Sequence, residues 1–162
     1  MKQHHYTVTV VWTGNDGRGT ATYTGYSRAH RITAPGKSPI DGSADPAFRG
    51  DLARWNPEEL LLASLSACHQ LWYLHLCATS GICVTAYEDA AEATMAEAPD
   101  GSGHVISAVL RPQVRVAPGC DIALAEALHG RAHAMCFIAR SVNFPVRHHP
   151  VVLAGTVDEP GA

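Results

Sequence analysis

The chain contains no long apolar run, because none of its segments reaches about 18 consecutive apolar residues, the length that a helix needs to cross a bilayer. It also has no excess of basic residues: 12 Lys and Arg stand against 15 Asp and Glu, for a formal net charge of -3. This balance argues against nucleic acid or an anionic membrane surface as the main partner. The opening residues, MKQHHYTVTVVW, have no apolar stretch ending in a small-residue cleavage site, and they predict a strand rather than a signal peptide. We therefore expect a cytoplasmic protein.

Closely spaced cysteine pairs are absent as well. The five cysteines are odd in number, and none of them forms the CxxC spacing of a zinc ribbon or a thioredoxin-like site. Persistent structural disulfides are rare in the reducing cytosol, so any disulfide here is expected to be transient and catalytic.

Hydrophobic periodicity and turn residues divide the chain into alternating strand and helix patterns. Strands are predicted at residues 5–13, 19–26, 28–34, 104–117 and 150–157, and in the first part of 82–96. Residues 35–55 are rich in Gly, Pro, Ser and Asp and predict a long loop. Helices are predicted over residues 56–81 and from Asp121 to about Ala139.

This order of elements indicates the α+β class with a mainly antiparallel sheet, because strands and helices do not alternate regularly. The 162 residues suffice for one domain with a sizeable core, or for one subunit of an intertwined dimer. We expect a single domain over residues 1–162, with a β-rich part over about 1–55 and a second α+β part over about 56–162.

The first predicted helix carries Cys68 near its middle. Asn56 can cap this helix, Pro57 suits its first turn, and Gly81 supplies a C-terminal stop. Helical spacing places Cys68 on one stripe with Leu61, Ser64, Leu65, Leu71, Trp72 and His75. Small residues before Cys68 allow another backbone to approach closely, which suggests a use for the thiol.

The other cysteines differ in their surroundings. Cys77 and Cys83 are expected to be buried as small hydrophobes, and Cys120 follows a Pro-Gly turn and is expected to be exposed. Cys136 lies three residues after His133 in the second predicted helix, so the imidazole could tune the thiol. A core cysteine beside a surface histidine explains the same spacing equally well, and both interpretations stay open.

Two motifs together resemble the OsmC/Ohr family, the osmotically induced and organic-hydroperoxide-resistance proteins. The first motif is Asn56-Pro57-Glu58 with Cys68 ten residues after the glutamate, and the second is Ala132-His133-Ala134-Met135-Cys136. The resemblance covers essentially the whole chain and implies antiparallel sheets packed around two long central helices in an intertwined homodimer. It also implies a thiol peroxidase in which Cys68 is the peroxidatic cysteine and Cys136 the resolving cysteine.

The family pattern further implies a glutamate and an arginine that support the reactive thiolate. Glu58 matches by motif, but on a helix it lies about 15 Å along the axis from Cys68, so both groups would come from a second subunit. The arginine position is occupied by Phe48, next to Arg49. We expect Arg49 to serve, with Arg18 and Arg54 as the alternatives.

The sequence departs from the family pattern at two positions. His69 stands where phenylalanine is common, and Phe137 stands where proline is common. His69 could hydrogen-bond near the site, or it could equally be a core or interface histidine. Apolar and aromatic residues are expected near the site and suit an organic hydroperoxide better than hydrogen peroxide: Phe48, Trp55, Leu65, Trp72 and Phe144.

The expected activity is therefore the reduction of organic hydroperoxides through a Cys68 sulfenate and a Cys68–Cys136 disulfide, an antioxidant function in the stress response. By analogy with the family, an external lipoyl-type dithiol would reduce the disulfide, and no metal, haem or flavin is required. Three alternatives to the peroxidase remain open. One is a metal site built from Cys68, Cys136, His133 and His69 or His75. The others are a non-catalytic protein that binds a small apolar ligand between its subunits and a hydrolase that uses Cys68 with a histidine base.

Overall fold

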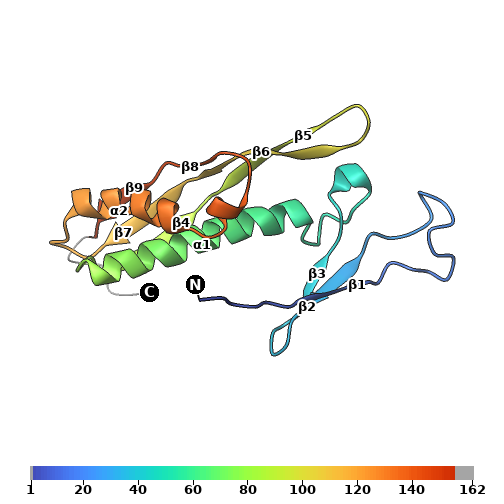
Figure 1. Cartoon of the computed structure of the whole chain (residues 1–162), viewed down its shortest axis with the longest axis horizontal. Helices are drawn as coiled ribbons and strands as arrows, with labels where there is room; N and C mark the ends of the chain where they lie inside the picture. The colour runs from blue at the N-terminus through green and yellow to red at the C-terminus, as the bar shows by residue number, and fades with distance from the viewer. Residues whose placement is uncertain (1, 156–162) are drawn as a thin grey trace. The chain divides into compact units, whose positions relative to one another are not determined.

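The computed structural model describes residues 2–155 and confirms the α+β class (Figure 1). The chain divides into two compact units, Met1–Leu60 and Leu61–Ala162, and each is described by itself. The expectation of a single domain with a β-rich part over about 1–55 stays a prediction. No helix within residues 2–155 is both long and apolar enough to cross a membrane.

The first unit contains a small antiparallel sheet. Its strands β1 (Thr9–Trp12), β2 (His30–Thr33) and β3 (Ile40–Gly42) lie in the order β1-β2-β3. Trp12 pairs with His30 and His30 pairs with Gly42, so β2 is the central strand. The predicted strands at 5–13 and 28–34 are confirmed by β1 and β2, although both are shorter than expected.

The predicted strand at residues 19–26 is wrong, because this segment forms turns instead. Gly19 has a positive φ of 59°, which a strand does not accommodate. The Arg28 guanidinium donates hydrogen bonds to the carbonyl oxygens of Tyr23 and Tyr26 and lies over both rings. These carbonyls are therefore satisfied by a side chain rather than by a neighbouring strand.

The segment predicted as a loop over residues 35–55 contains two short elements. Strand β3 is one, and the other is a 3-10 helix, η1 (Pro46–Phe48), whose N-terminus is capped by Asp45. The expectation of a loop was wrong at these positions, since β3 pairs with the preceding strand β2 across the six residues 34–39.

Helix α1 (Pro57–Thr79) confirms the predicted helix and its end signals. The Asn56 side chain accepts a hydrogen bond from the Glu59 N–H at 2.7 Å, and the Glu59 carboxylate accepts one from the Asn56 N–H at 3.1 Å. This reciprocal pair is a capping box. At the other end Gly81 adopts a φ of 76°, and the Ile82 N–H donates to the Cys77 carbonyl, which closes the helix.

The second unit holds two three-stranded sheets. One has the order β4-β7-β9 and the other the order β5-β6-β8. Their bounds are β4 (Val84–Asp89), β5 (Glu92–Glu97), β6 (Gly103–Leu110), β7 (Pro112–Val116), β8 (Val146–His148) and β9 (Val151–Ala154). The pairs β4–β7 and β5–β6 are antiparallel, whereas β6–β8 and β7–β9 are parallel, so the sheets are mixed.

Strand β8 was not predicted. Strand β9 confirms the strand expected at residues 150–157, of which residues 156 and 157 lie outside the described residues. The strand predicted at 104–117 is interrupted at Arg111, so that β6 and β7 belong to different sheets. Pro112 explains the position of the break: it has no N–H to donate and is tolerated as the first residue of a strand.

Asp89 stabilises this break. Its carboxylate accepts a hydrogen bond from the Arg111 N–H at 2.6 Å and another from the Ser66 hydroxyl of α1, also at 2.6 Å. The first bond satisfies a backbone group that leaves the strand pairing, and the second ties α1 to the junction between the two sheets. Asp89 therefore supports both the sheet geometry and the placement of the helix.

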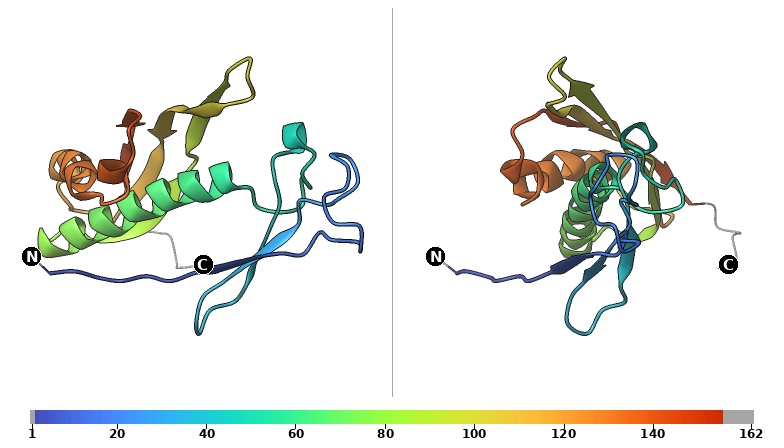
Figure 2. Two further views of the ribbon diagram at one scale, coloured as in Figure 1. Left: turned by 45° about the vertical axis from the view of Figure 1, so that its right-hand side comes forward. Right: turned by 90° about the vertical axis from the view of Figure 1, so that its right-hand side faces the viewer.

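Helix α2 (Ile122–Met135) begins at Asp121, whose side chain accepts from the Leu124 N–H, and it packs beside α1 (Figures 1 and 2). A shared core joins the two helices to β7 and β9: Tyr73, Leu76, Cys77, Ile82, Val114, Val116, Ala125, Leu128, Ala132 and Val152. Cys77 is buried as expected. Cys83 is exposed, contrary to expectation, because it precedes β4 outside the core, and Cys120 is half-buried rather than exposed.

Replacing Asp89 with alanine would leave the Arg111 N–H and the Ser66 hydroxyl without their acceptor. We expect Asp89→Ala to lower the free energy of unfolding by about 2–4 kcal/mol, since both lost bonds go to a carboxylate. Guanidinium unfolding followed by circular dichroism measures the change. Glu88→Ala, at the exposed neighbouring position of β4, serves as the matched control and should shift stability by less than about 0.5 kcal/mol. Equal effects of the two variants would contradict this role for Asp89.

Candidate functional site

Cys68 and Cys136 lie next to each other in the second unit, close enough for the Cys68 thiol to contribute to the raised pKa of Cys136. Cys68 is half-buried on α1, and Cys136 is buried, with 1% of its surface exposed. All five cysteines are free thiols. The structure thus brings together the two cysteines that the sequence singled out, which are 68 residues apart in the chain.

Cys136 follows α2 rather than lying within it, which corrects the helix predicted to about Ala139. The helix ends at Met135, and Cys136 adopts an extended conformation with φ -65° and ψ 111°. Its N–H donates to the His133 carbonyl, and its Sγ accepts from the Ala139 N–H at 3.4 Å as the 3-10 helix η2 (Ala139–Ser141) begins. Leaving the helix turns the Cys136 side chain to α1.

The environment of Cys136 favours its neutral form. Burial, the largest cause, and the neighbouring Cys68 thiol together raise the pKa of Cys136 to about 11, although the Ala139 N–H acts in the opposite direction. Cys136 is therefore a protonated thiol at neutral pH. The His133 imidazole was one candidate for tuning the Cys136 thiol. In the structure its ring lies against His148, with centroids 5.1 Å apart, and the bond between His133 and Cys136 is a backbone hydrogen bond.

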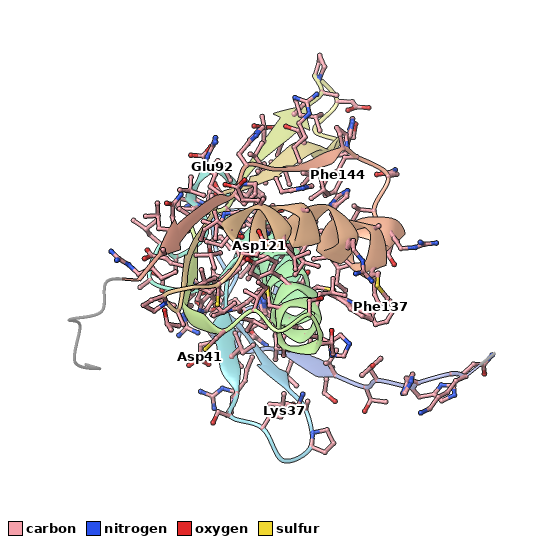
Figure 3. The ribbon with its side chains drawn as sticks, turned by 90° about the vertical axis from the view of Figure 1, so that its left-hand side faces the viewer. Lys37, Asp41, Glu92, Asp121, Phe137 and Phe144 are labelled. Carbon is pink, nitrogen blue, oxygen red and sulfur yellow. The ribbon has the colours of Figure 1, made fainter. Side chains whose placement is uncertain are left out.

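A pocket of about 530 Å³ opens above Cys68. Its wall is almost entirely apolar and consists of Ser64, Ala67, Cys68, Leu71, Trp72, His75, Phe137 and Ile138. Trp72 and Phe137 meet edge to face with centroids 5.5 Å apart, and Phe137 remains 67% exposed. Figure 3 labels Phe137 just beyond one end of α2 and Asp121 at the other.

Most of the stripe predicted around Cys68 lines this pocket, which confirms the helical face. Leu65 instead is buried in the protein interior, and Phe144 is not part of the wall. Phe137 and Ile138 were not predicted as pocket residues, because they reach it only after the chain leaves α2. Phe48 and Trp55 belong to the first unit, so their expected place near the thiol stays a prediction.

A buried cluster of imidazoles lies beside the thiols. His69, which follows Cys68, and His129 on α2 are fully buried, and one ring donates a hydrogen bond to the other between Nε2 of His69 and Nδ1 of His129 at 3.0 Å. His129 also stacks on Tyr73 with centroids 3.7 Å apart. The sequence left open whether His69 lies near the site or is a core or interface histidine, and in the structure it is buried in the core. The places of His129 and His148 in this cluster were not predicted, because their neighbours come from distant segments.

Burial keeps these rings neutral. It lowers the pKa of His69 to about 4, with further contributions from His148 and His133, and it lowers the pKa of His129 to about 3, with contributions from His69 and His148. His148 is shifted in the same direction for the same main reason. Among the described residues, Nδ1 of His69, Nε2 of His129 and Nδ1 of His133 have no hydrogen-bond partner.

The three candidate arginines differ in their contacts. Arg18 pairs with Asp16 at 2.6 Å, and Arg54 lies 3.4 Å from the Asp51 carboxylate. Arg49 pairs with no carboxylate within residues 2–155 and has a left-handed φ of 66°. Its guanidinium carbon lies 6.0 Å from the centroid of the Tyr23 ring. Because Arg49 and Cys68 belong to different units, their pairing stays a prediction.

Glu58 is half-buried in the first turn of α1, while its neighbour Glu59 makes the capping box, so the support of an arginine by Glu58 stays a prediction. Within residues 2–155, no three His, Cys, Asp or Glu side chains are arranged to hold a metal ion, so the metal-site alternative has no ligand set there.

The fold and the site define an α+β protein with two thiols in contact below an apolar pocket. Residues 49–149 match the family of OsmC-like proteins, and the chain belongs to this family. An OsmC-like protein of unknown function from Vibrio cholerae is 32% identical, with a TM-score of 0.82 over 92% of this chain and 100% of that one. No curated protein matches the chain.

More distant structures share the fold. An organic hydroperoxide resistance protein OsmC from Legionella pneumophila is 20% identical, with a TM-score of 0.64 over 93% of this chain and 98% of that chain. The organic hydroperoxide resistance protein OhrB of Bacillus subtilis is 21% identical, with a TM-score of 0.61 over 90% and 98% of the two chains. The predicted resemblance to the OsmC/Ohr family is confirmed.

The raised pKa of Cys136 predicts slow alkylation. At pH 8 about a hundredfold less of this thiol is ionised than of a cysteine with the ordinary value. We expect iodoacetamide to label Cys136 slowly in the folded parent protein, with an initial rate that rises about tenfold per pH unit from pH 8 to pH 10. Peptide mapping by mass spectrometry measures this rate, and the guanidinium-unfolded protein is the control. A rate that levels off below pH 9 would contradict the prediction.

The buried imidazoles predict a loss of stability in acid. An unfolded histidine takes up a proton near pH 6.5, but His69 and His129 do so in the folded protein only near pH 4 and pH 3. Stability is therefore fully present above about pH 6.5 and is lost as the pH falls below it, by up to about 1.4 kcal/mol per pH unit for each ring.

Replacing one ring tests this origin of the pH dependence. We expect His129→Leu to unfold with a shallower dependence of stability on pH between 4 and 6.5, whatever its stability at pH 7.5. Urea unfolding at several pH values measures the slope, and His104→Leu, at an exposed position of β6, is the matched control with an unchanged slope. If the two variants kept the same slope as the parent protein, the buried rings would not be its source.

Proposed function

We propose that this protein is a cysteine-based peroxidase that reduces organic hydroperoxides to alcohols. The observation that carries the proposal is the contact between the Cys68 and Cys136 thiols at an apolar pocket of about 530 Å³. The relatives from Legionella pneumophila and Bacillus subtilis, both described as organic hydroperoxide resistance proteins, support the same chemistry.

In the first step the Cys68 thiolate attacks the terminal oxygen of the hydroperoxide. The O–O bond breaks, its electron pair leaves with the alkoxide, and a proton from solvent gives the alcohol, while Cys68 becomes a sulfenic acid. The apolar wall formed by Trp72, Leu71 and Phe137 suits the organic part of the substrate. Half-burial leaves Cys68 accessible for this attack.

In the second step Cys136 resolves the sulfenic acid. Its sulfur attacks the Cys68 sulfur, hydroxide leaves with the Cys136 proton as water, and a disulfide forms. The protonated state of Cys136 in the resting protein keeps it from competing for the peroxide, because the thiol is a poor nucleophile. An external dithiol of the lipoyl type then returns both cysteines to thiols by two exchange steps.

The proposal includes a homodimer in the cytoplasm, with Arg49 and Glu58 of a second copy beside Cys68. An arginine next to the thiolate supplies positive charge and hydrogen-bond donors for the peroxide, and a carboxylate fixes its guanidinium. Within residues 2–155 Arg49 forms no ion pair, and this supports its choice over Arg18 and Arg54, which pair with carboxylates.

Consumption of cumene hydroperoxide with dihydrolipoamide as the reductant tests the proposal. We expect Cys68→Ser to lose activity by at least about a thousandfold, because the remaining thiol nearby, Cys136, is buried and protonated. Cys136→Ser should complete one turnover and accumulate a Cys68 sulfenic acid that dimedone traps. Ala78→Ser, at an exposed position of the same helix, is the matched control and should keep the parent activity.

The alternative is a non-catalytic protein that binds a small apolar ligand, which the apolar pocket wall also favours. Full hydroperoxide consumption by Cys68→Ser would exclude the peroxidase. Saturable binding of a hydrophobic fluorescent probe, together with an unreacted Cys68 after one equivalent of cumene hydroperoxide, would establish the binding function instead.

A further inference from the structure

The three cysteines outside the proposed peroxidase site gather at one place in the second unit. Cys77 lies in the last turns of α1, Cys83 precedes β4, and Cys120 precedes the cap of α2. The Cys83 N–H donates a hydrogen bond to Sγ of Cys120 at 3.4 Å. The Cα atom of Cys83 therefore lies no more than about 5 Å from this sulfur, since the N–Cα bond is about 1.46 Å long.

Backbone hydrogen bonds hold the two cysteines in this arrangement. The Ala117 N–H donates to the Cys83 carbonyl at 2.8 Å, and the Cys120 N–H donates to the Ala117 carbonyl at 3.3 Å. Gly119, with a φ of 83°, allows the tight turn between them. The adjoining strand residues Val84 and Val116 are paired, so the sheet itself sets the separation of the two chain segments. A disulfide needs Cα atoms within about 7 Å, which this arrangement favours with little backbone movement.

The three thiols differ in accessibility. Cys83 is exposed, Cys120 is half-buried, and Cys77 is buried within the core. Burial raises the pKa of Cys77, which keeps this third thiol protonated and unreactive although it lies near Cys120. A reaction with a small disulfide in solution would thus begin at Cys83, and Cys120 would complete it.

We propose that Cys83 and Cys120 are a second redox-active thiol pair, separate from Cys68 and Cys136, that exchanges with small disulfides in solution. The Cys83 thiolate attacks one sulfur of the small disulfide and releases the other half as a thiolate. Cys120 loses its proton to solvent and attacks the Cys83 sulfur of this mixed disulfide. The second half then leaves as a thiolate, and a Cys83–Cys120 disulfide remains. Two protein thiols are oxidised, and one small disulfide is reduced to two thiols.

Glutathione disulfide is the probe, and the full chain carrying Cys68→Ser and Cys136→Ser is the protein, so the proposed peroxidase pair cannot contribute. We expect the intact mass to fall by two hydrogens, two glutathione thiols to be released per chain, and peptide mapping to join Cys83 to Cys120. Adding Cys120→Ser should leave glutathione attached to Cys83 and slow release of the second glutathione at least tenfold. Adding Cys83→Ser should prevent both reactions.

Three results would overturn the proposal. They are a lasting glutathione adduct on Cys83 while Cys120 is present, a disulfide that joins Cys77 to either residue, and no reaction while a short cysteine peptide is fully oxidised. If the double serine background does not fold, peptide mapping of the parent protein after the same treatment decides the question, because only a Cys83–Cys120 peptide supports the pair. Hydroperoxide consumption is not measured in either experiment, so failure here leaves the proposed peroxidase untouched.

Discussion

The contact of His129 with Tyr73 and His69 determines how α1 lies along α2, and the position of the two thiols follows from it. His129 stacks on Tyr73 and shares a hydrogen bond with His69, so one residue of α2 is bound to two turns of α1. Cys68 is the neighbour of His69, and Cys136 lies seven residues after His129. A shift of one helix along the other would break the stack, the hydrogen bond and the contact of the thiols together.

The junction between the two sheets adds a second constraint on α1. Asp89 binds the Arg111 N–H at the break between β6 and β7, and it also binds Ser66, two residues before Cys68. The helix is thus held on one side by the imidazoles and on the other by a carboxylate of the sheet. The pocket above Cys68 is built on a rigid helix, whereas Phe137 and Ile138 reach it from the segment after α2.

The same burial that stabilises this arrangement disfavours charge near the thiols. It keeps His69 and His129 neutral and raises the pKa of Cys136. Within residues 61–155, neither sulfur has an arginine as a hydrogen-bond partner. All three candidate arginines, Arg49, Arg18 and Arg54, belong to the first unit.

The sequence by itself determined the features that depend on neighbouring residues. Residues a few positions apart determine the caps of α1 and the start of α2 at Asp121. The helical face around Cys68 and the family motifs can likewise be recognised from short stretches of sequence. Only the tertiary structure decided the break at Arg111, the existence of β8, the exit of the chain from α2 before Cys136, and the meeting of His69 with His129. The break needs Asp89 as an acceptor, β8 needs β6, and His69 needs His129, and in each case the partner is distant in the sequence. The residues near each feature do not indicate which distant segment supplies this partner.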